Sequence, residues 1–136
     1  MSNLEQTLSI IKPDAVERNL IEEIKQEFKK NNFTILKEKK IKLEKQEAEK
    51  FYKVHQTKPF YNDLCEYLSS GPILAMILEK EDAIQANRNI MGATDPKKAE
   101  EGTIRKSFGI SIDKNSVHGS DSTENAKIEI EFFFKN

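Results

Sequence analysis

The sequence of 136 residues contains no tryptophan, one cysteine and two histidines. The lone Cys65 cannot form an internal disulfide, and one cysteine with two histidines gives no plausible zinc set. The longest apolar run, residues 73–78, is far too short to cross a bilayer, and the N-terminus lacks a secretory signal pattern. These absences predict a soluble protein of the reducing cytoplasm, with no membrane partner.

An excess of charge of either sign is also missing. The 23 acidic and 22 basic residues nearly cancel and leave a formal net charge of −1. Because a dedicated nucleic-acid-binding domain is normally basic on one face, this balance argues against one, although a local positive pocket is still allowed. The length suits a single domain over residues 1–136.

The P-loop is a third absence. No Gly-x-x-x-x-Gly-Lys-Ser/Thr sequence occurs anywhere in the chain, which excludes an ordinary P-loop kinase. The carboxylates do not form a set that indicates a dedicated metal cage. We therefore expect no metal ligands from protein side chains.

Three strands are predicted before the long central loop. Residues 7–11 are β-branched and aliphatic and stop at Lys12 and Pro13, whereas residues 73–78 form an apolar run typical of a strand buried on both faces. Between them, apolar residues of segment 33–43 keep one alternating phase, as expected of a strand with one wet face.

Helical spacing of apolar residues predicts helices over 19–31, 48–55, 60–68 and 82–91. Asn19 and Glu22 form a capping box for the first helix, and Asp82 caps the last. The middle two form a hairpin, in which His55 is assigned to packing because its spacing from Phe51 is helical.

The C-terminal third begins with a segment, residues 92–116, that has no clear periodicity. A loop this long in a small domain is usually functional or disordered, and Arg105 and Asn115 favour the functional interpretation. Residues 126–134 fit both a strand and a helix, and the capping pair Asp121 and Glu124 favours the helix.

A short strand is predicted at His118, between the long loop and the last helix. The resulting element order is a split βαβ pattern with insertions. It predicts an α+β, ferredoxin-like fold, in which an antiparallel four-stranded sheet is covered by helices.

The segment 115–122, Asn-Ser-Val-His-Gly-Ser-Asp-Ser, carries the densest chemistry of the chain. A neutral imidazole, about three quarters of the population at pH 7, can attack a phosphorus centre without a separate base. His118 is therefore the candidate nucleophile. Taken by itself, the segment also fits a turn that merely contains a histidine.

Five separated blocks decide between these alternatives. They are IKPDA at 11–15, PF at 59–60, NRNIMGATDP at 87–96, GTIR at 102–105 and NSVHGSDS at 115–122. In this order they resemble nucleoside diphosphate kinase from near the first residue to near the last. The resemblance implies the same fold, and a ping-pong transfer of the γ-phosphate of a nucleoside triphosphate, chiefly ATP, to a nucleoside diphosphate through phosphohistidine.

The resemblance also implies roles for single residues. His118 matches the nucleophile, Glu129 the carboxylate that holds its imidazole, and Ser120 and Lys12 lie in the same catalytic group. The positions that match nucleotide-binding residues of the family are Lys12, Tyr52, Phe60, Leu64, Arg88, Thr94, Arg105, Ile112 and Asn115. The implied partners are ATP, GTP, GDP and deoxynucleoside diphosphates, and Mg²⁺ is expected to arrive on the nucleotide's phosphates.

The residues alone leave several of these roles open. Lys12, Arg88 and Arg105 suit phosphate binding, yet each is one of 22 basic residues and is more typical of a solvated surface. Phe60 after a proline suits stacking on a base of any kind, and equally suits a core position. Glu129 alone is indistinguishable from an exposed acid.

Rival functions and departures from the family pattern complete the expectations. An RNA-recognition domain needs exposed aromatics on its central strands, and residues 73–78 have none. The alternative is a catalytically inactive nucleotide-binding module. Glu22 and Lys58 stand where the family commonly has glycine and arginine, and the sequence stops at Asn136, where many relatives use tail residues between subunits. A homo-oligomer is implied, with hexamer and tetramer both open.

Overall fold

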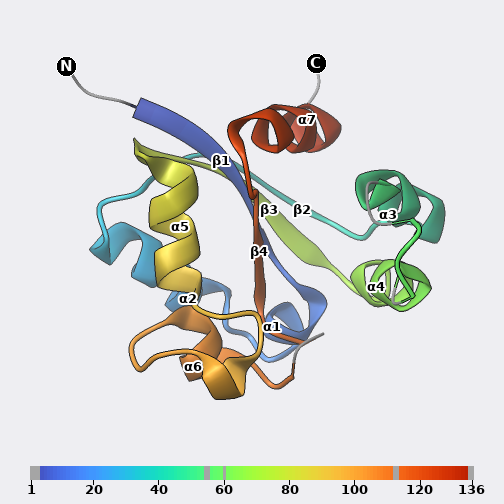
Figure 1. The fold of residues 1–136 in the computed structure, drawn as a ribbon, viewed down its shortest axis with the longest axis horizontal. Coiled ribbons are helices and arrows are strands. Elements are labelled where there is room, and N and C mark those ends of the chain that lie inside the picture. Colours follow the sequence, from blue (N-terminus) through green and yellow to red (C-terminus); the bar gives the residue numbers. More distant parts are fainter. Residues whose placement is uncertain (1–3, 54–55, 60, 112–113, 135–136) are drawn as a thin grey trace.

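The computed structural model describes residues 4–53, 56–59, 61–111 and 114–134. Four strands form one antiparallel sheet in the order β2-β3-β1-β4 (Figure 1). They are β1 (Leu4–Ile11), β2 (Thr34–Ile41), β3 (Ile73–Glu81) and β4 (Val117–Gly119). The sheet and its helices confirm the predicted α+β, ferredoxin-like fold.

Helices pack against both faces of this sheet. They are α1 (Pro13–Glu17), α2 (Ile21–Lys30), α3 (Lys45–Phe51), α4 (Tyr61–Leu68), α5 (Ala83–Met91), η2 (Pro96–Lys98), α6 (Ile104–Phe108) and α7 (Thr123–Phe134). Helices α2 and α5 contribute to one core, which contains Phe28 and Met91, and α3, α4 and α7 contribute to a second, which contains Leu68 and Phe133 (Figure 1). His55 lies outside the described residues.

Strand β3 is buried on both faces, as predicted. Leu74, Met76 and Leu78 belong to the first core, whereas Ile73 and Ala75 belong to the second. This division follows from the alternation of side chains along a strand. The central strand therefore joins the two cores.

The single alternating phase predicted for residues 33–43 is wrong, because β2 contains a bulge. Ile35 pairs with Leu78 and Lys37 pairs with Ile77, so that Leu36 is an extra residue in the ladder. One inserted residue exchanges the two faces of a strand. As a result Ile35 packs on the first core and Ile41 on the second.

One of the predicted helix caps is also wrong. Asn19 takes the left-handed conformation, with φ of 61°, at the junction between α1 and α2, and the N-cap residue of α2 is Leu20. Asparagine tolerates this conformation better than most residues, which explains its position there. Asp82 does occupy the N-cap of α5, but its φ is 50° and the Ile84 N–H instead donates to Glu5 Oε1 at 2.9 Å.

The C-terminal segment is a helix, as predicted, with Ala126 and Phe133 buried. Its first turn is capped by Ser122, whose Oγ accepts the Asn125 N–H at 3.1 Å. Asp121 instead accepts the Asn125 side-chain amide at 2.6 Å. The Asp121 and Glu124 capping pair therefore predicted the helix correctly, although the residue that caps its first turn is Ser122.

The described part of segment 92–116 contains regular structure that its lack of periodicity did not indicate. It contains the short helices η2 and α6, which pack against each other. Asp95 Oδ1 accepts the Lys97 N–H at 3.0 Å and Thr103 Oγ1 accepts the Lys106 N–H at 3.3 Å, which caps each helix. Helices of three and five residues are too short to show an apolar period, so the sequence pattern missed them.

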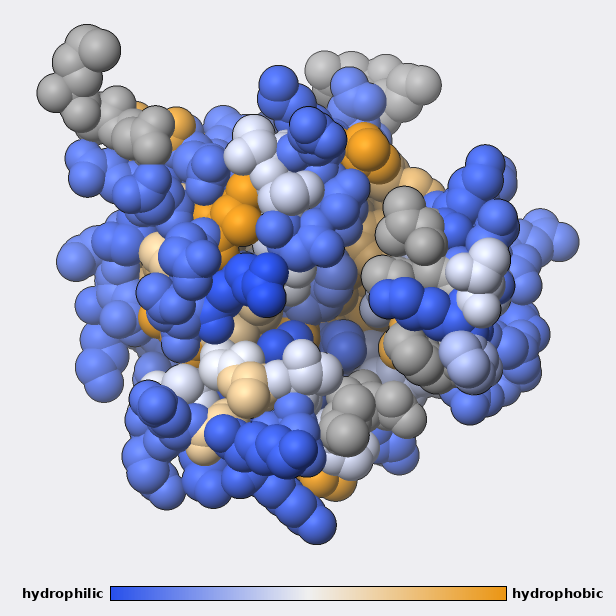
Figure 2. Space-filling model, viewed as in Figure 1, coloured by the Kyte–Doolittle hydropathy of each residue, from blue (hydrophilic) through white to orange (hydrophobic). Residues whose placement is uncertain are grey.

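The surface in Figure 2 is hydrophilic over most of the visible face, and its apolar areas are small and separate. In the described ranges, the helices are too short or too polar to cross a membrane.

Candidate active site

The candidate nucleophile lies on the short edge strand β4. His118 pairs with Ile10 and Gly119 pairs with Ser9 of β1, which fixes the height of the imidazole on the sheet. A Cβ at Gly119 would lie 2.3 Å from Asn87 Nδ2 on α5, so only glycine allows β4 to pack this closely. The His118 side chain remains 20% exposed, which leaves one edge of the ring open to a ligand.

Glu129 of α7 contacts the His118 imidazole at its Nε2 edge. His118 Nε2 lies 3.1 Å from Glu129 Oε1. Ser120 Oγ donates to the same Oε1 at 2.8 Å and accepts the Leu8 N–H at 3.2 Å. With Nε2 facing the carboxylate, the neutral ring carries its proton there and its lone pair at Nδ1.

Two aromatic rings limit the movement of His118. Phe51 stands edge-on to it with ring centroids 5.3 Å apart, and the Tyr52 centroid lies 6.3 Å away. Burial, with a further contribution from Glu129, raises the pKa of Tyr52 well above its ordinary value. Its hydroxyl therefore stays protonated at neutral pH and can donate a hydrogen bond.

Arg105 is a cation held in place next to β4 by two hydrogen bonds. Its Nη1 donates to Gly92 O at 3.0 Å and its Nη2 donates to Val117 O at 2.9 Å. Burial, together with the charge of Arg88, lowers the pKa of Arg105 to about 10, which still leaves it charged at neutral pH. One guanidinium thus connects the start of segment 92–116 to β4.

A cavity of about 440 Å³ opens between α5 and segment 92–105, and we call it the α5 cavity. Arg88, Thr94 and Arg105 line it together with Lys98 and Gln85. Arg88 and Thr94 are exposed, so both can reach a ligand without displacing protein contacts. Among the described residues that line this cavity, His118 is absent. The lining residue Arg105 donates to Val117 O, next to His118 in β4.

Lys12 and Asn115 meet just before the start of β4. Lys12 Nζ donates to Asn115 Oδ1 at 2.9 Å, and Asn115 Nδ2 donates to Thr94 O at 3.1 Å. Ser116 has φ of 76°, and the Val117 N–H bonds back to Asn115 O at 3.0 Å, which makes a γ-turn. Such a conformation costs about 1–3 kcal/mol for a residue other than glycine and is common at functional sites.

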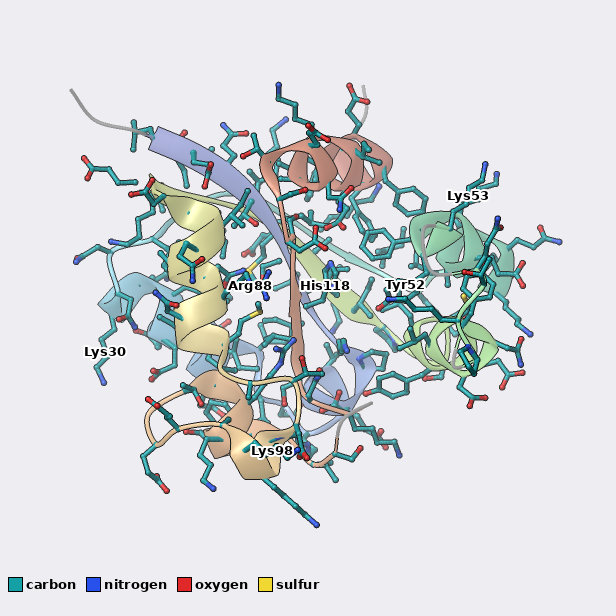
Figure 3. All side chains as sticks on the ribbon, viewed as in Figure 1. Lys30, Tyr52, Lys53, Arg88, Lys98 and His118 are labelled. Atoms are coloured by element: carbon teal, nitrogen blue, oxygen red, sulfur yellow. The ribbon has the colours of Figure 1, made fainter. Side chains whose placement is uncertain are left out.

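The predicted residues therefore form two connected groups, and Figure 3 shows Arg88 and Tyr52 on either side of His118. His118, Glu129, Ser120 and Tyr52 lie together, while the cations with Thr94 and Asn115 form the second group. Leu64 is half-buried on α4 and packs against the second core. Phe60 and Ile112 lie outside the described residues.

Sequence reasoning missed the residues that support these groups. Phe51 was read only as a helix-packing residue, although it stands against the imidazole. Asp14 is buried and bonded to Tyr67 and Arg18, residues that no motif connects to it. A carboxylate directly after Lys-Pro in an otherwise apolar segment was the one available signal for Asp14.

A bare metal ion does not fit this donor set. Within the described ranges, no group of three or more His, Cys, Asp or Glu side chains could hold one. The ligand-facing groups are cations and amides, which favour the anionic complex of Mg²⁺ with a nucleotide over the free ion.

Comparisons with known proteins agree with this geometry. A family model described as nucleoside diphosphate kinase matches residues 5–136. Proteins of that name from Wolinella succinogenes and Campylobacter jejuni subsp. jejuni serotype O:2 are 56% and 57% identical over 131 and 132 residues. The alignment with the Wolinella protein covers 96% of this chain and 96% of that protein. The alignment with the Campylobacter protein covers 97% of this chain and 96% of that protein.

Solved structures of nucleoside diphosphate kinases are also similar to this chain. The nucleoside diphosphate kinase of Aquifex aeolicus superposes with a TM-score of 0.95 at 41% identity, over 98% of this chain and 96% of that one. The enzyme of that name from Encephalitozoon cuniculi superposes with a TM-score of 0.93 at 36% identity, over 97% and 90%.

Proposed function

Because the chain belongs to the nucleoside diphosphate kinase family, we propose that His118 carries the phosphoryl group between two nucleotides. The family and the named relatives confirm nucleoside diphosphate kinase as the function and do not support a catalytically inactive module. The proposal concerns the finer level, which is the residues that perform the reaction and the order of its steps.

The contact between His118 and Glu129 is the observation that carries this proposal. With Nε2 held at 3.1 Å from the carboxylate, Nδ1 is the nitrogen that attacks the γ-phosphorus. An N–P bond forms at Nδ1 while the bond from the γ-phosphorus to the bridging oxygen breaks, and a nucleoside diphosphate leaves. A terminal oxygen of a second nucleoside diphosphate then takes the phosphoryl group, which restores the free imidazole.

Glu129 and Ser120 act on the ring rather than on the substrate. The Glu129 carboxylate keeps the ring oriented and balances the positive charge that the phosphorylated imidazole acquires. Ser120 keeps that carboxylate in place, because its hydroxyl donates to Oε1 while the Leu8 N–H fixes the hydroxyl oxygen.

Arg88, Arg105 and Lys12 stabilise the phosphates. Phosphoryl transfer depends mainly on positioning and on positive charge directed at the phosphate oxygens. Arg88, Arg105 and Thr94 share the α5 cavity, and Arg105 also reaches β4. Lys12 and Asn115, with the Tyr52 hydroxyl, complete the set of donors for phosphate and sugar oxygens.

The magnesium ion of the family reaction enters as part of the nucleotide. When bound, Mg²⁺ would neutralise part of the negative charge on the nucleotide's phosphates. No protein carboxylate is assigned to it. The chain's own contribution is the cationic lining of the cavity, whose side chains would donate hydrogen bonds to the phosphate oxygens.

Base recognition is proposed to be weak. Leu64 on α4, with Phe60 and Ile112, forms the proposed wall for the base, and contact with a base face tolerates every base. This predicts that ATP, GTP, GDP and deoxynucleoside diphosphates all serve as substrates.

Assembly and compartment follow the family expectation. We expect a homo-oligomer, hexamer or tetramer, and β2 offers an edge strand with Leu36 43% exposed that is available for pairing. The single buried Cys65 suits a reducing cytoplasm. Light scattering of the purified protein distinguishes the two assemblies.

The decisive test is direct labelling. Incubating the protein with magnesium and γ-labelled ATP, followed by denaturation, should give an acid-labile and alkali-stable label that added GDP removes. His118→Ala should lose the label and essentially all turnover while remaining folded, whereas His55→Ala, which removes the other histidine, should keep both. Normal turnover in His118→Ala would refute the nucleophile.

A further inference from the structure

Asp14 of α1 is a buried carboxylate with an unusually complete set of partners. Its side chain is 4% exposed. The Tyr67 hydroxyl donates to Oδ1 and accepts the Asp14 N–H at 2.8 Å, while Arg18 Nη2 donates to Oδ2 at 3.1 Å. Burying a charge is costly unless it is paired, so this arrangement fixes Asp14 firmly in place.

The same carboxylate reaches the turn that precedes β4. Ser116 Oγ donates to Asp14 Oδ2 at 3.4 Å. Arg18 Nη2 also donates to Ser116 Oγ at 3.4 Å and to Phe108 O at 2.5 Å, at the end of α6. The chain therefore brings α1, α4, α6 and the turn together at one ion pair, in which Asp14 is buried and Arg18 is partly exposed.

This turn has a strained backbone next to the active site. Ser116 holds φ of 76°, and its carbonyl accepts the Lys12 N–H at 2.8 Å. Its neighbour Asn115 holds the Lys12 ammonium at 2.9 Å and the Thr94 carbonyl at 3.1 Å. Any relaxation of Ser116 would therefore move Asn115 and the ammonium that it orients.

We propose that Asp14 is a positioning residue for nucleotide binding, because through Tyr67, Arg18 and Ser116 it holds the turn that places Asn115 and Lys12. The inference rests on the proposed function, since it concerns the same phosphate-binding groups. It assigns Asp14 no contact with the nucleotide. Its effect should appear in binding, because the His118–Glu129 pair is built from β4 and α7 and does not include it.

The first test is Asp14→Asn, which keeps the shape of the side chain and removes its charge. We expect KM for the nucleoside triphosphate to rise about tenfold while kcat at saturation changes less than about twofold. The matched control is Glu66→Gln on α4, which removes one charge from the exposed pair of Lys45 and Glu66, 3.4 Å apart. A lower melting temperature with an unchanged KM would show that Asp14 only stabilises the fold, and would overturn the proposal.

A double-variant cycle tests the route through Ser116. Ser116→Ala alone should raise KM, and adding it to Asp14→Asn should raise KM no further, because the contact is already lost. Independent, multiplicative increases would overturn this route. If Asp14→Asn does not fold, Tyr67→Phe removes only the hydroxyl and should raise KM about threefold. An unchanged KM in Tyr67→Phe would also overturn the proposal.

Reactivity of Lys12 gives a readout that needs no catalysis. Acetic anhydride labelling followed by mass spectrometry should acetylate Lys12 several-fold faster in Asp14→Asn than in wild type or in Glu66→Gln. An unchanged rate would refute the role of Asp14. Absence of nucleotide exchange in the wild-type protein would instead refute the proposed function, so the two failures are distinguishable.

Discussion

The proposed nucleophile and the proposed phosphate-binding groups form two sides of the candidate site that differ in how they are held. His118 and Glu129 are 20% and 16% exposed and are joined directly through Oε1, which Ser120 also holds. Arg88 and Thr94 are exposed and line an open cavity. The reacting nitrogen must have one orientation, whereas groups that bind phosphate can adjust to donor and acceptor nucleotides in turn.

The two sides also differ in how the chain builds them. His118 on β4, Ser120 directly after it and Glu129 on α7 are close in sequence, and the paired residues His118 and Glu129 are only 11 residues apart. Lys12 and Asn115 are 103 residues apart and meet only after the sheet has formed. A local arrangement can be rigid by itself, while a distant one needs supports such as the network around Asp14.

The largest expected effect distinguishes orientation from charge on the nucleophile side. Glu129→Ala removes the acceptor of His118 Nε2 and of Ser120 Oγ, and should lower the rate of His118 phosphorylation by about 10–100-fold. Glu129→Gln keeps an acceptor oxygen but loses the charge, so its loss should be smaller. Rapid-quench measurement of the phosphorylated enzyme checks both, and equal rates in wild type and Glu129→Ala would remove the distinction between the two sides.

A smaller effect is expected when the cations are exchanged. Arg105→Lys keeps the charge but cannot make both bonds, to Gly92 O and to Val117 O, so KM should rise about tenfold and the melting temperature should fall. Arg88→Lys lies on an exposed position and should raise KM only about twofold to threefold. Steady-state kinetics and calorimetry on both variants test which substitution raises KM more. A larger rise in KM for Arg88→Lys than for Arg105→Lys would contradict the expectation.

Sequence reasoning found the elements better than the contacts between them. The apolar run of residues 73–78 located β3, and the capping pair of Asp121 and Glu124 favoured the helix α7 where periodicity alone also allowed a strand. Sequence reasoning missed the bulge at Leu36, since an inserted residue changes the faces without changing composition. It placed Asp82 at the N-cap of α5 but did not predict that the Ile84 N–H donates to Glu5, 79 residues away.

The candidate site shows the same division. Motif resemblance placed His118 and Glu129 in one site, and the structure brings them to 3.1 Å. The contact of Asp14 with Tyr67 spans 53 residues and that with Ser116 spans 102, and no local pattern encodes either. Such contacts depend on the packed sheet, which explains why sequence alone did not predict them.

The smallest expected effect concerns Asp121, which follows Ser120 and lies between the two sides. Its pKa is lowered, first by the hydrogen bond from Asn125 and further by the charges of Arg88 and His118. Because the folded pKa is below the unfolded value of about 3.9, this stabilisation is present above that pH and is lost as the pH falls through the folded pKa.

Asn125→Ala removes the first of these causes and should therefore reduce the stability difference between pH 7 and strongly acid pH. The change in helix propensity from asparagine to alanine does not depend on pH, so only the pH-dependent part reports on Asp121. Urea unfolding across this pH range measures it, with Asp121→Asn as the background in which Asn125→Ala should leave the pH dependence unchanged. A pH dependence equal to that of wild type in Asn125→Ala would mean that the hydrogen bond from Asn125 does not lower the pKa of Asp121, and that the remaining causes, its backbone hydrogen bond and the charges of Arg88 and His118, are sufficient.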